Sequence, residues 1–194
     1  KDYAKFVPVK NPGHNKEKMY KLFTGGDIDV NGDGKNDKFE WGGLKNEGVF
    51  SDYYTMRMVR SSRIHFMQLA QNLLRGAQAI ERASVNDTNS INSNKASIEK
   101  QKAIDILDKH FEELPIGRVK VDELTGYLAT MYYEAGDTTK GDLYCGKLAN
   151  LYAENIKFFA AQDEEYIIDM IQEIGSFMTY FTLLEQGRGD NKFS

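Results

Sequence analysis

The sequence predicts an all-α fold of about five amphipathic helices in a bundle or α-solenoid-like arrangement, preceded by an N-terminal arm. Apolar residues recur every three or four positions over most of residues 52–181. No segment alternates between apolar and polar residues for long enough to indicate a strand. With 194 residues, of which 41% are hydrophobic, the chain is long enough to bury one globular core.

The N-terminal arm, residues 1–51, precedes a helical domain of residues 52–194. The start of the arm contains two of the three prolines and shows no helical period, which favours an extended backbone. Residues 15–23 are predicted to form a short helix with Asn15 as its N-cap. Trp41, the only tryptophan, is expected to anchor the arm in the core.

Residues 29–40 read D-x-N-x-D-G-x-x-D-x-x-E and match the EF-hand-like calcium-loop pattern at each ligand position. Calcium takes about six to eight hard oxygen ligands, so acidic and amide side chains must recur at alternate positions of a tight loop. Gly34 at the sixth position permits the sharp turn. The predicted Ca²⁺ ligands are Asp29, Asn31, Asp33, Lys35 through its carbonyl oxygen, Asp37 and Glu40.

Polar surface turns prefer the same residue types, so a glycine-rich turn without a metal is the alternative interpretation of this loop. The loop also differs from a paired EF-hand. Gly25-Gly26 interrupts any entering helix, and no second loop follows in the chain. The pattern resembles the single calcium loops of dockerins and extracellular repeat modules.

The helical domain is predicted to begin with a helix over residues 52–84, followed by a polar tract at 84–94 that is expected to be a loop. The next helix carries an apolar stripe over residues 103–114 and ends before Pro115. The last predicted helix is capped by Asp163 and gives way to a polar tail from Gln186. Its apolar stripe consists of Ile167, Ile171, Ile174, Met178 and Phe181.

A short helical hairpin is predicted around Gly136. Residues 124–135 have helical spacing, Gly136 is the expected C-cap, and Asp137 is the expected N-cap of the following helix. The pattern L-A-x-x-Y-Y-x-A-G-D resembles a tetratricopeptide helix pair, whereas residues 66–115 match that repeat only weakly. The domain is therefore expected to be tetratricopeptide-like.

Composition and motifs exclude several classes of function. The net charge of −4, with scattered basic residues, does not predict a nucleic-acid surface. No apolar run approaches the roughly 18 residues that a membrane-spanning helix needs. G-x-S-x-G, P-loop, C-x-x-C and H-E-x-x-H patterns are all missing, so no catalytic residue is predicted.

A few titratable residues have structural interpretations. His65 and His110 lie in predicted helices and are expected to be surface histidines or buried histidines with satisfied ring nitrogens. Glu112-Glu113 is interpreted as solvated surface, because adjacent residues of a helix do not share a face. Cys145 is expected to be a small buried thiol.

Several motifs point to a family. They are K-F-E-W-G-G-L at residues 38–44, then Arg57-Met58, Arg63, Phe66, Leu69-Ala70 and Gly76, and A-x-x-Y-Y-x-x-G-D-x-x-K from Ala129 to Lys140. In these the chain resembles the C-terminal soluble region of a Bacteroidetes family of multi-spanning membrane proteins of unknown function. That family is similar to the transmembrane protein O-mannosyltransferases. The match covers most of residues 15–160, with the calcium loop and the polar tract as insertions.

The resemblance implies a tetratricopeptide-like domain on the periplasmic face of the membrane, attached to a glycosyltransferase-like membrane protein. A chain that begins at Lys1 without a signal-peptide pattern is expected to be a fragment of such a protein. The fragment would be non-catalytic, because the family's presumed catalytic acid lies in the membrane part. A protein or peptide is its expected partner, with membrane contact only through the parent chain and no nucleic acid.

Two other classes of function are possible interpretations. One is a free-standing calcium-dependent carbohydrate- or peptide-binding module, in which calcium touches the ligand directly. Six ligands from the loop itself would leave little room for that contact. The other is an enzyme, which would need a polar cluster in a pocket that the sequence does not indicate.

Overall fold

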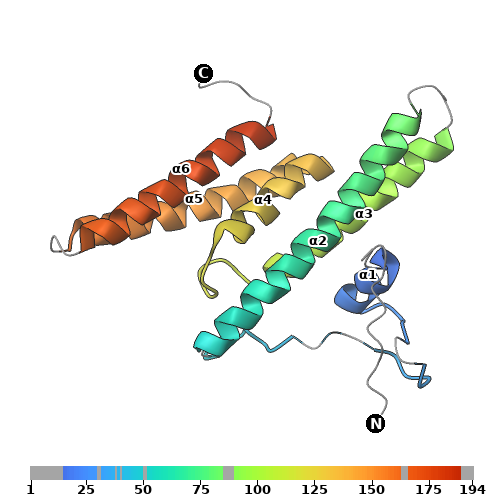
Figure 1. Ribbon diagram of the computed structural model, residues 1–194, viewed down its shortest axis with the longest axis horizontal. Helices are drawn as coiled ribbons and strands as arrows, with labels where there is room; N and C mark the ends of the chain where they lie inside the picture. The colour runs from blue at the N-terminus through green and yellow to red at the C-terminus, as the bar shows by residue number, and fades with distance from the viewer. Residues whose placement is uncertain are drawn as a thin grey trace, which may run out of the picture.

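The computed structural model describes residues 15–29, 32–37, 39, 41–49, 52–84, 90–162 and 166–188. Within this part of the chain the only β-type contact is an isolated bridge between Ile116 and Val119, so the predicted all-α class is confirmed (Figure 1). The helices are, in chain order, α1 (Lys16–Thr24), α2 (Tyr53–Ser84), α3 (Ser90–Glu113), α4 (Glu123–Ala135), α5 (Thr138–Ala160) and α6 (Ile167–Arg188).

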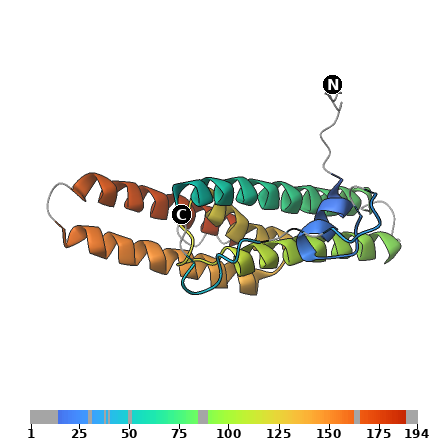
Figure 2. The ribbon, with the colours of Figure 1, turned by 90° about the horizontal axis from the view of Figure 1, so that it is seen from below.

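The long helices pair as two antiparallel hairpins, α2 with α3 and α5 with α6, as both views show (Figures 1 and 2). The short helix α4 contacts all four of these helices. Most of its 13 residues are buried. Helix α4 therefore joins the two hairpins into one core.

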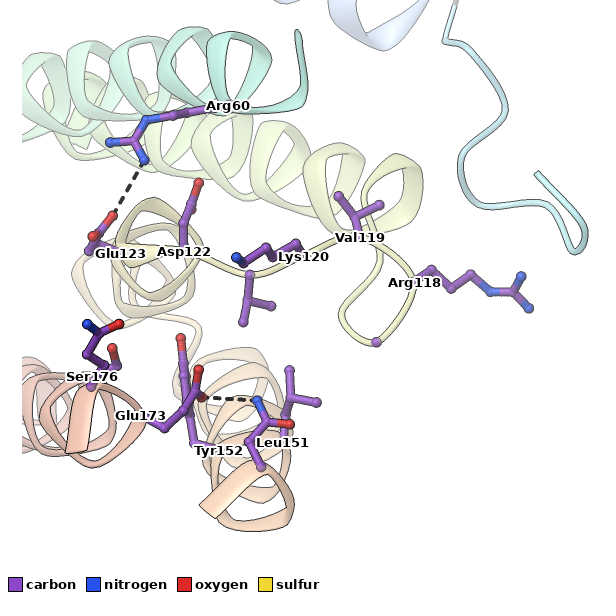
Figure 3. A pocket seen from close by; sticks show the side chains of 14 residues that line it. Arg60, Arg118, Val119, Lys120, Asp122, Glu123, Leu151, Tyr152, Glu173 and Ser176 are labelled. Carbon is purple, nitrogen blue, oxygen red and sulfur yellow. Dashed lines mark hydrogen bonds and ion pairs between the residues drawn. The ribbon is translucent and has the colours of Figure 1, made fainter. Parts of the chain in front are cut away.

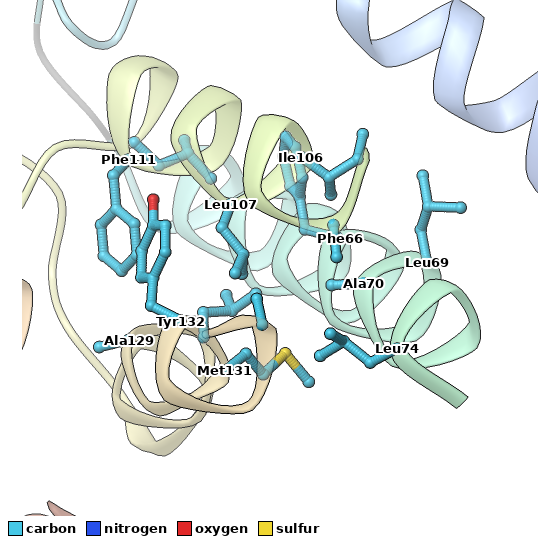
Figure 4. Close-up of a cluster of buried hydrophobic side chains, with 14 of the residues drawn as sticks. Phe66, Leu69, Ala70, Leu74, Ile106, Leu107, Phe111, Ala129, Met131 and Tyr132 are labelled. Carbon is cyan, nitrogen blue, oxygen red and sulfur yellow. The ribbon is translucent and has the colours of Figure 1, made fainter. Parts of the chain in front are cut away.

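The core fills the space between α4 and the α2–α3 hairpin (Figure 4). Its members follow the spacing of three and four residues that puts one stripe of each helix on the same side. Truncating a side chain of this kind to alanine ordinarily costs about 2–5 kcal/mol. The cluster includes Phe66, Leu69, Ala70, Leu74, Ile106, Leu107, Phe111, Ala129, Met131 and Tyr132.

Asp108 of α3 fixes the α4–α5 hairpin to the α2–α3 hairpin. Its carboxylate accepts a hydrogen bond from the hydroxyl of Tyr132 at 2.8 Å and one from the ammonium of Lys140 at 2.6 Å. Burial, followed by the bond to Asp108, raises the pKa of Tyr132 far above its usual value, so the hydroxyl stays a donor. The predicted caps of this hairpin, Gly136 and Asp137, are both confirmed.

The arm is attached to the helices through aromatic rings. Trp41 stacks on Phe66 of α2 with ring centroids 5.1 Å apart. Phe23 of α1 is buried and contacts Phe66 at 4.9 Å and Trp41 at 5.8 Å. Aromatic contacts of this kind contribute beyond the area they bury. The prediction that Trp41 anchors the arm is confirmed.

Polar contacts hold α1 against α3. The Tyr20 hydroxyl donates to Asp105 at 2.6 Å, and Lys16 forms an ion pair with Glu99. That ion pair lies against Gly76 of α2, where an added Cβ would be 3.1 Å from both charged groups. Gly76 therefore provides the space in which α1 docks.

Two boundaries differ from the prediction. Helix α3 begins at Ser90, so residues 90–94 of the polar tract are helical, and residues 85–89 lie outside the described residues. Polar residues are tolerated there because residues 93–95 face solvent. Helix α6 runs to Arg188, past the predicted tail at Gln186. The predicted N-cap Asp163 also lies outside the described residues.

The interpretation of Glu112-Glu113 as solvated surface is wrong for Glu113. Its side chain is only 4% exposed and accepts from Lys45 at 2.9 Å and from Lys109 at 2.7 Å. Because Lys45 belongs to the arm, the buried carboxylate ties the arm to the end of α3. Buried charges are found with such partners because desolvation alone would be costly.

His110 departs from its prediction as well. It is fully buried between Phe66 and Phe111, and within the described residues neither ring nitrogen has a hydrogen-bond partner. Burial, and then the nearby charge of Arg63, lower the pKa of His110 well below 6.5. The ring is therefore neutral in the folded protein and charges readily only on unfolding. Cys145, in contrast, is buried as predicted.

Acid should weaken the fold through His110. Since its pKa is lower folded than unfolded, the unfolded state binds the extra proton as pH falls through about 6.5, and stability drops. Between pH 7 and pH 5 this group can remove at most about 2 kcal/mol of stability. Urea denaturation at several pH values should show a smaller loss in His110→Leu. The exposed His65, changed to Gln, is the control; equal pH slopes in wild type and His110→Leu would contradict the assignment.

Two glycines of α5, Gly141 and Gly146, allow a matched test of how closely α4 and α5 approach each other. A Cβ at Gly141 would lie 2.6 Å from the ring of Tyr133, whereas one at Gly146 would meet nothing within 4 Å. Alanine favours a helix over glycine by about 1 kcal/mol, but overpacking costs about 1–3 kcal/mol. Thermal unfolding should therefore show Gly146→Ala to be stabilised and Gly141→Ala to be destabilised. Stabilisation by both changes would refute the close approach of α4 and α5.

Candidate calcium loop and interhelical groove

The predicted calcium loop follows α1 and is wound around the carboxylate of Asp29. Backbone N–H groups of Gly32, Asp33 and Gly34 donate to the two Asp29 oxygens at 2.5, 3.2 and 2.8 Å. Gly32 and Gly34 have φ angles of 80° and 78°, which favour glycine. The tight turn that the glycine at the sixth position was expected to allow is therefore present.

The base of the loop is closed by backbone contacts. The N–H of Asp37 donates to the carbonyl of Ile28 at 2.6 Å, and the N–H of Ile28 donates to the side chain of Asn36 at 2.9 Å. One step further out, Phe39 donates to the carbonyl of Leu22 in α1 at 3.2 Å. These bonds hold the two ends of the loop together and leave its tip exposed.

The residues present have the oxygen donors that calcium prefers. Asp29, Asp33, Lys35 and Asp37 lie in the described part, whereas Asn31 and Glu40 lie outside it. Among described residues, no group of three or more His, Cys, Asp and Glu side chains is gathered closely enough to hold a metal ion. The winding of the loop thus fits the pattern, and calcium binding stays a prediction.

A second candidate site is an open groove of about 520 Å³ beside the start of α4 (Figure 3). Its walls come from α2, the connector between α3 and α4, α5 and α6. The residues that line it are Arg60, Gly117, Arg118, Val119, Lys120, Val121, Asp122, Glu123, Leu151, Tyr152, Asn155, Gln172, Glu173 and Ser176.

Buried Arg63 of α2 positions the connector that forms one wall of the groove. Its guanidinium donates to the carbonyl oxygen of Lys120 at 2.7 Å and lies 3.1 Å from the carboxylate of Asp122. Asp122 is also the N-cap of α4 and accepts from the N–H of Thr125 at 3.1 Å. The backbone of Lys120 is thus turned toward Arg63, and its side chain belongs to the groove lining.

The carboxylates of the groove already have partners. Glu123 lies 3.8 Å from Arg60, and Glu173 accepts from Asn155 at 3.0 Å (Figure 3). Arg118 pairs with Glu47 of the arm at 3.0 Å. Lys120, by contrast, forms no ion pair with any described residue. Lys120 is therefore the cation of the lining that a bound anionic group could reach without displacing a described carboxylate.

The lining combines polar and apolar side chains. It contains no His or Cys, and its carboxylates are occupied by capping, by an ion pair or by a hydrogen bond from an amide. Apolar Leu151 and Val121 beside polar side chains are suited to a peptide, which presents both kinds of group.

No pattern in the sequence indicates this groove. The connector at residues 116–122 has no periodic pattern, and the wall residues are scattered over four segments. The residue that could have pointed to the groove is Arg63. An arginine within an apolar helical stripe needs a partner if it is buried, and that partner is the connector in the groove wall.

The motif residues behind the family resemblance are used for packing in the structure. Trp41 and Phe66 stack, Arg63 holds the connector, and Tyr132 and Lys140 share Asp108. These motifs therefore describe how the domain is held together, not a reactive centre.

No protein-family profile, curated protein or solved structure matches this chain. The resemblance drawn from the motifs therefore stays a prediction. No helix in the described part of the chain combines the length and apolar character needed to cross a membrane.

Calcium should stabilise the protein if the loop binds it. At a calcium concentration about one hundred times the Kd, binding to the folded state alone adds about 2.7 kcal/mol. Thermal unfolding in EDTA and in ~1 mM calcium should therefore show a higher Tm with calcium, but not with magnesium. Asp33→Ala should abolish the rise, and Asp169→Ala, an exposed position on α6 outside the predicted ligand set, should keep it. A persistent rise in Asp33→Ala would refute the site.

Proposed function

We propose that this chain is a non-catalytic helical interaction domain that binds an extended segment of a protein partner in the groove beside α4. The groove carries the proposal, because it combines a lysine that pairs with no described residue, apolar wall residues and already occupied carboxylates. Open grooves between helices are common places for peptides to dock.

The proposed setting of the domain is the periplasmic face of a membrane, attached to a glycosyltransferase-like parent protein. The motifs at residues 38–44 and 129–140 support this setting through the family resemblance. In this setting the domain would position a partner or an acceptor protein for the parent.

A tetratricopeptide-like arrangement is part of the proposal. The antiparallel pairs α2–α3 and α4–α5, followed by α6, have the order expected of two helix pairs and a closing helix. Gly141 allows α4 and α5 to approach closely, which such pairs require.

The proposed calcium site has a structural role. Its loop lies between α1 and the aromatic anchor at Trp41, so a bound ion would brace the arm against the helices. The alternative, a free-standing module in which calcium touches a carbohydrate or peptide, has less support, because none of the groove-lining residues belongs to the loop at 29–40.

Peptide selection tests the proposed function. A random-peptide display library should yield binders, and Lys120→Glu should weaken their binding at least about tenfold, or 1.4 kcal/mol, because it reverses the available charge. Lys95→Glu, the same change on the exposed far end of α3, is the matched control. Fluorescence anisotropy of a labelled selected peptide gives the Kd. A library without binders, or binders indifferent to Lys120→Glu, would refute the groove as the site.

A further inference from the structure

The aromatic ring on which the arm rests also covers a buried histidine. Phe66 of α2 contacts Trp41 of the arm at 5.1 Å and Phe23 of α1 at 4.9 Å, measured between ring centroids. The same ring meets the imidazole of His110 in a T-shaped contact at 5.3 Å. The arm and His110 therefore share one packing partner, so a change at the histidine acts directly on the anchor of the arm.

The surroundings of His110 suit only the neutral imidazole. In the part of the chain that the structure describes, neither ring nitrogen has a hydrogen-bond partner. The nearby charge is that of Arg63, a buried cation that opposes a second positive charge. The carboxylate of Asp122 already pairs with Arg63 at 3.1 Å. A protonated ring would thus be buried without compensation, which is strongly unfavourable.

The other charged groups around the end of α3 also have partners. Glu113 accepts from Lys109 and from Lys45 of the arm. The titratable groups that α1, α4 and α5 direct at α3 form pairs of their own, namely Lys16–Glu99, Glu17–Lys102, Tyr20–Asp105, Tyr132–Asp108 and Lys140–Asp108. A proton on His110 would therefore find no free carboxylate among these described neighbours.

The arm is the element that gives way most easily. Phe23 is the one buried residue among the nine of α1, whereas eight of the 13 residues of α4 are buried. Segments with few buried contacts open before a whole domain unfolds. A hollow of about 520 Å³ already extends beneath the arm to Lys109 and Glu113, on either side of His110 in the sequence. Departure of the arm would bring the water of this hollow next to the ring.

We propose that protonation of His110 releases the N-terminal arm, which is a strap that docks at neutral pH and undocks in mild acid while α2 to α6 stay folded. Once the arm leaves, Phe66 is uncovered and the imidazolium gains water as a hydrogen-bond acceptor.

The direction of the pH effect follows from the state that binds the proton. The pKa of His110 is lowered in the docked protein, first by burial and then by Arg63, and returns toward about 6.5 when the ring meets water. Docking is therefore fully favoured above about pH 6.5 and weakens as pH falls below it. One proton lowers the docking constant by at most about 25-fold between pH 7 and pH 5.

Amide hydrogen exchange in α1 tests the release. A helix of nine residues is not stable on its own, so protection of its amides from exchange reports arm docking. After correction for the intrinsic exchange rate at each pH, protection in α1 should be lower than in α4. It should also fall by about 5- to 25-fold from pH 7 to pH 5. EDTA is present throughout, so that the predicted calcium loop does not contribute.

Four variants separate the histidine from the arm's other contacts. His110→Leu and His110→Gln cannot take up the proton, so α1 protection should no longer depend on pH; circular dichroism verifies that both variants fold. His65→Gln is the control and should keep the fall. Lys45→Met removes an arm contact and should lower α1 protection at both pH values without changing their ratio.

Three results would each overturn the proposal. Equal protection of α1 and α4 would mean that the arm opens only with the whole domain. Protection of α1 that is the same at pH 7 and pH 5 in the wild type would mean that arm opening takes up no proton. A fall that persists in both His110 variants would assign the proton to another group.

Discussion

The arrangement of the two helical hairpins depends on one buried charge, the guanidinium of Arg63. Its side chain is 2% exposed, and a buried charge without compensation would cost several kcal/mol. The α3–α4 connector must therefore pass where the carbonyl of Lys120 and the carboxylate of Asp122 can reach the guanidinium. Because Asp122 is also the N-cap of α4, the same contact determines where that helix begins. A requirement of electrostatics thus sets the position of the helix that joins both hairpins.

The groove follows from the lengths of the helices around this contact. Helix α4 has 13 residues, whereas α5 and α6 have 23 and 22. Helix α4 is short and begins only at Glu123. Next to its first residue, no helix fills the space between α2, α5 and α6. The connector crosses this space, turns at Gly117 and Arg118, and supplies Lys120 to its wall. A longer α4 would fill the groove, so the length of one helix decides whether the domain has this groove.

Local features of the fold could be predicted from the sequence, and features that depend on which helices meet could not. The caps at Asn15, Gly136 and Asp137 are determined by neighbouring residues, and helical spacing predicted the apolar stripe of residues 103–114, in which Leu107 and Phe111 are buried. In contrast, His110 and Glu113 lie on α3, which also has an exposed face. His110 is buried by packing with α2, and Glu113 is buried by its contact with the arm. The groove likewise combines four distant segments. The calcium ligands remain a prediction, with two of them outside the described residues.

The single tryptophan has a further consequence for how this protein can be observed. Trp41 stacks on Phe66 at the boundary between arm and helices, while the helices themselves contain no other indole. Its emission spectrum therefore reports the environment of that boundary alone, and far-ultraviolet circular dichroism reports the helices. If the arm separates before the helices melt, the two signals will change at different denaturant concentrations. The chain thus contains its own optical reporter of arm docking.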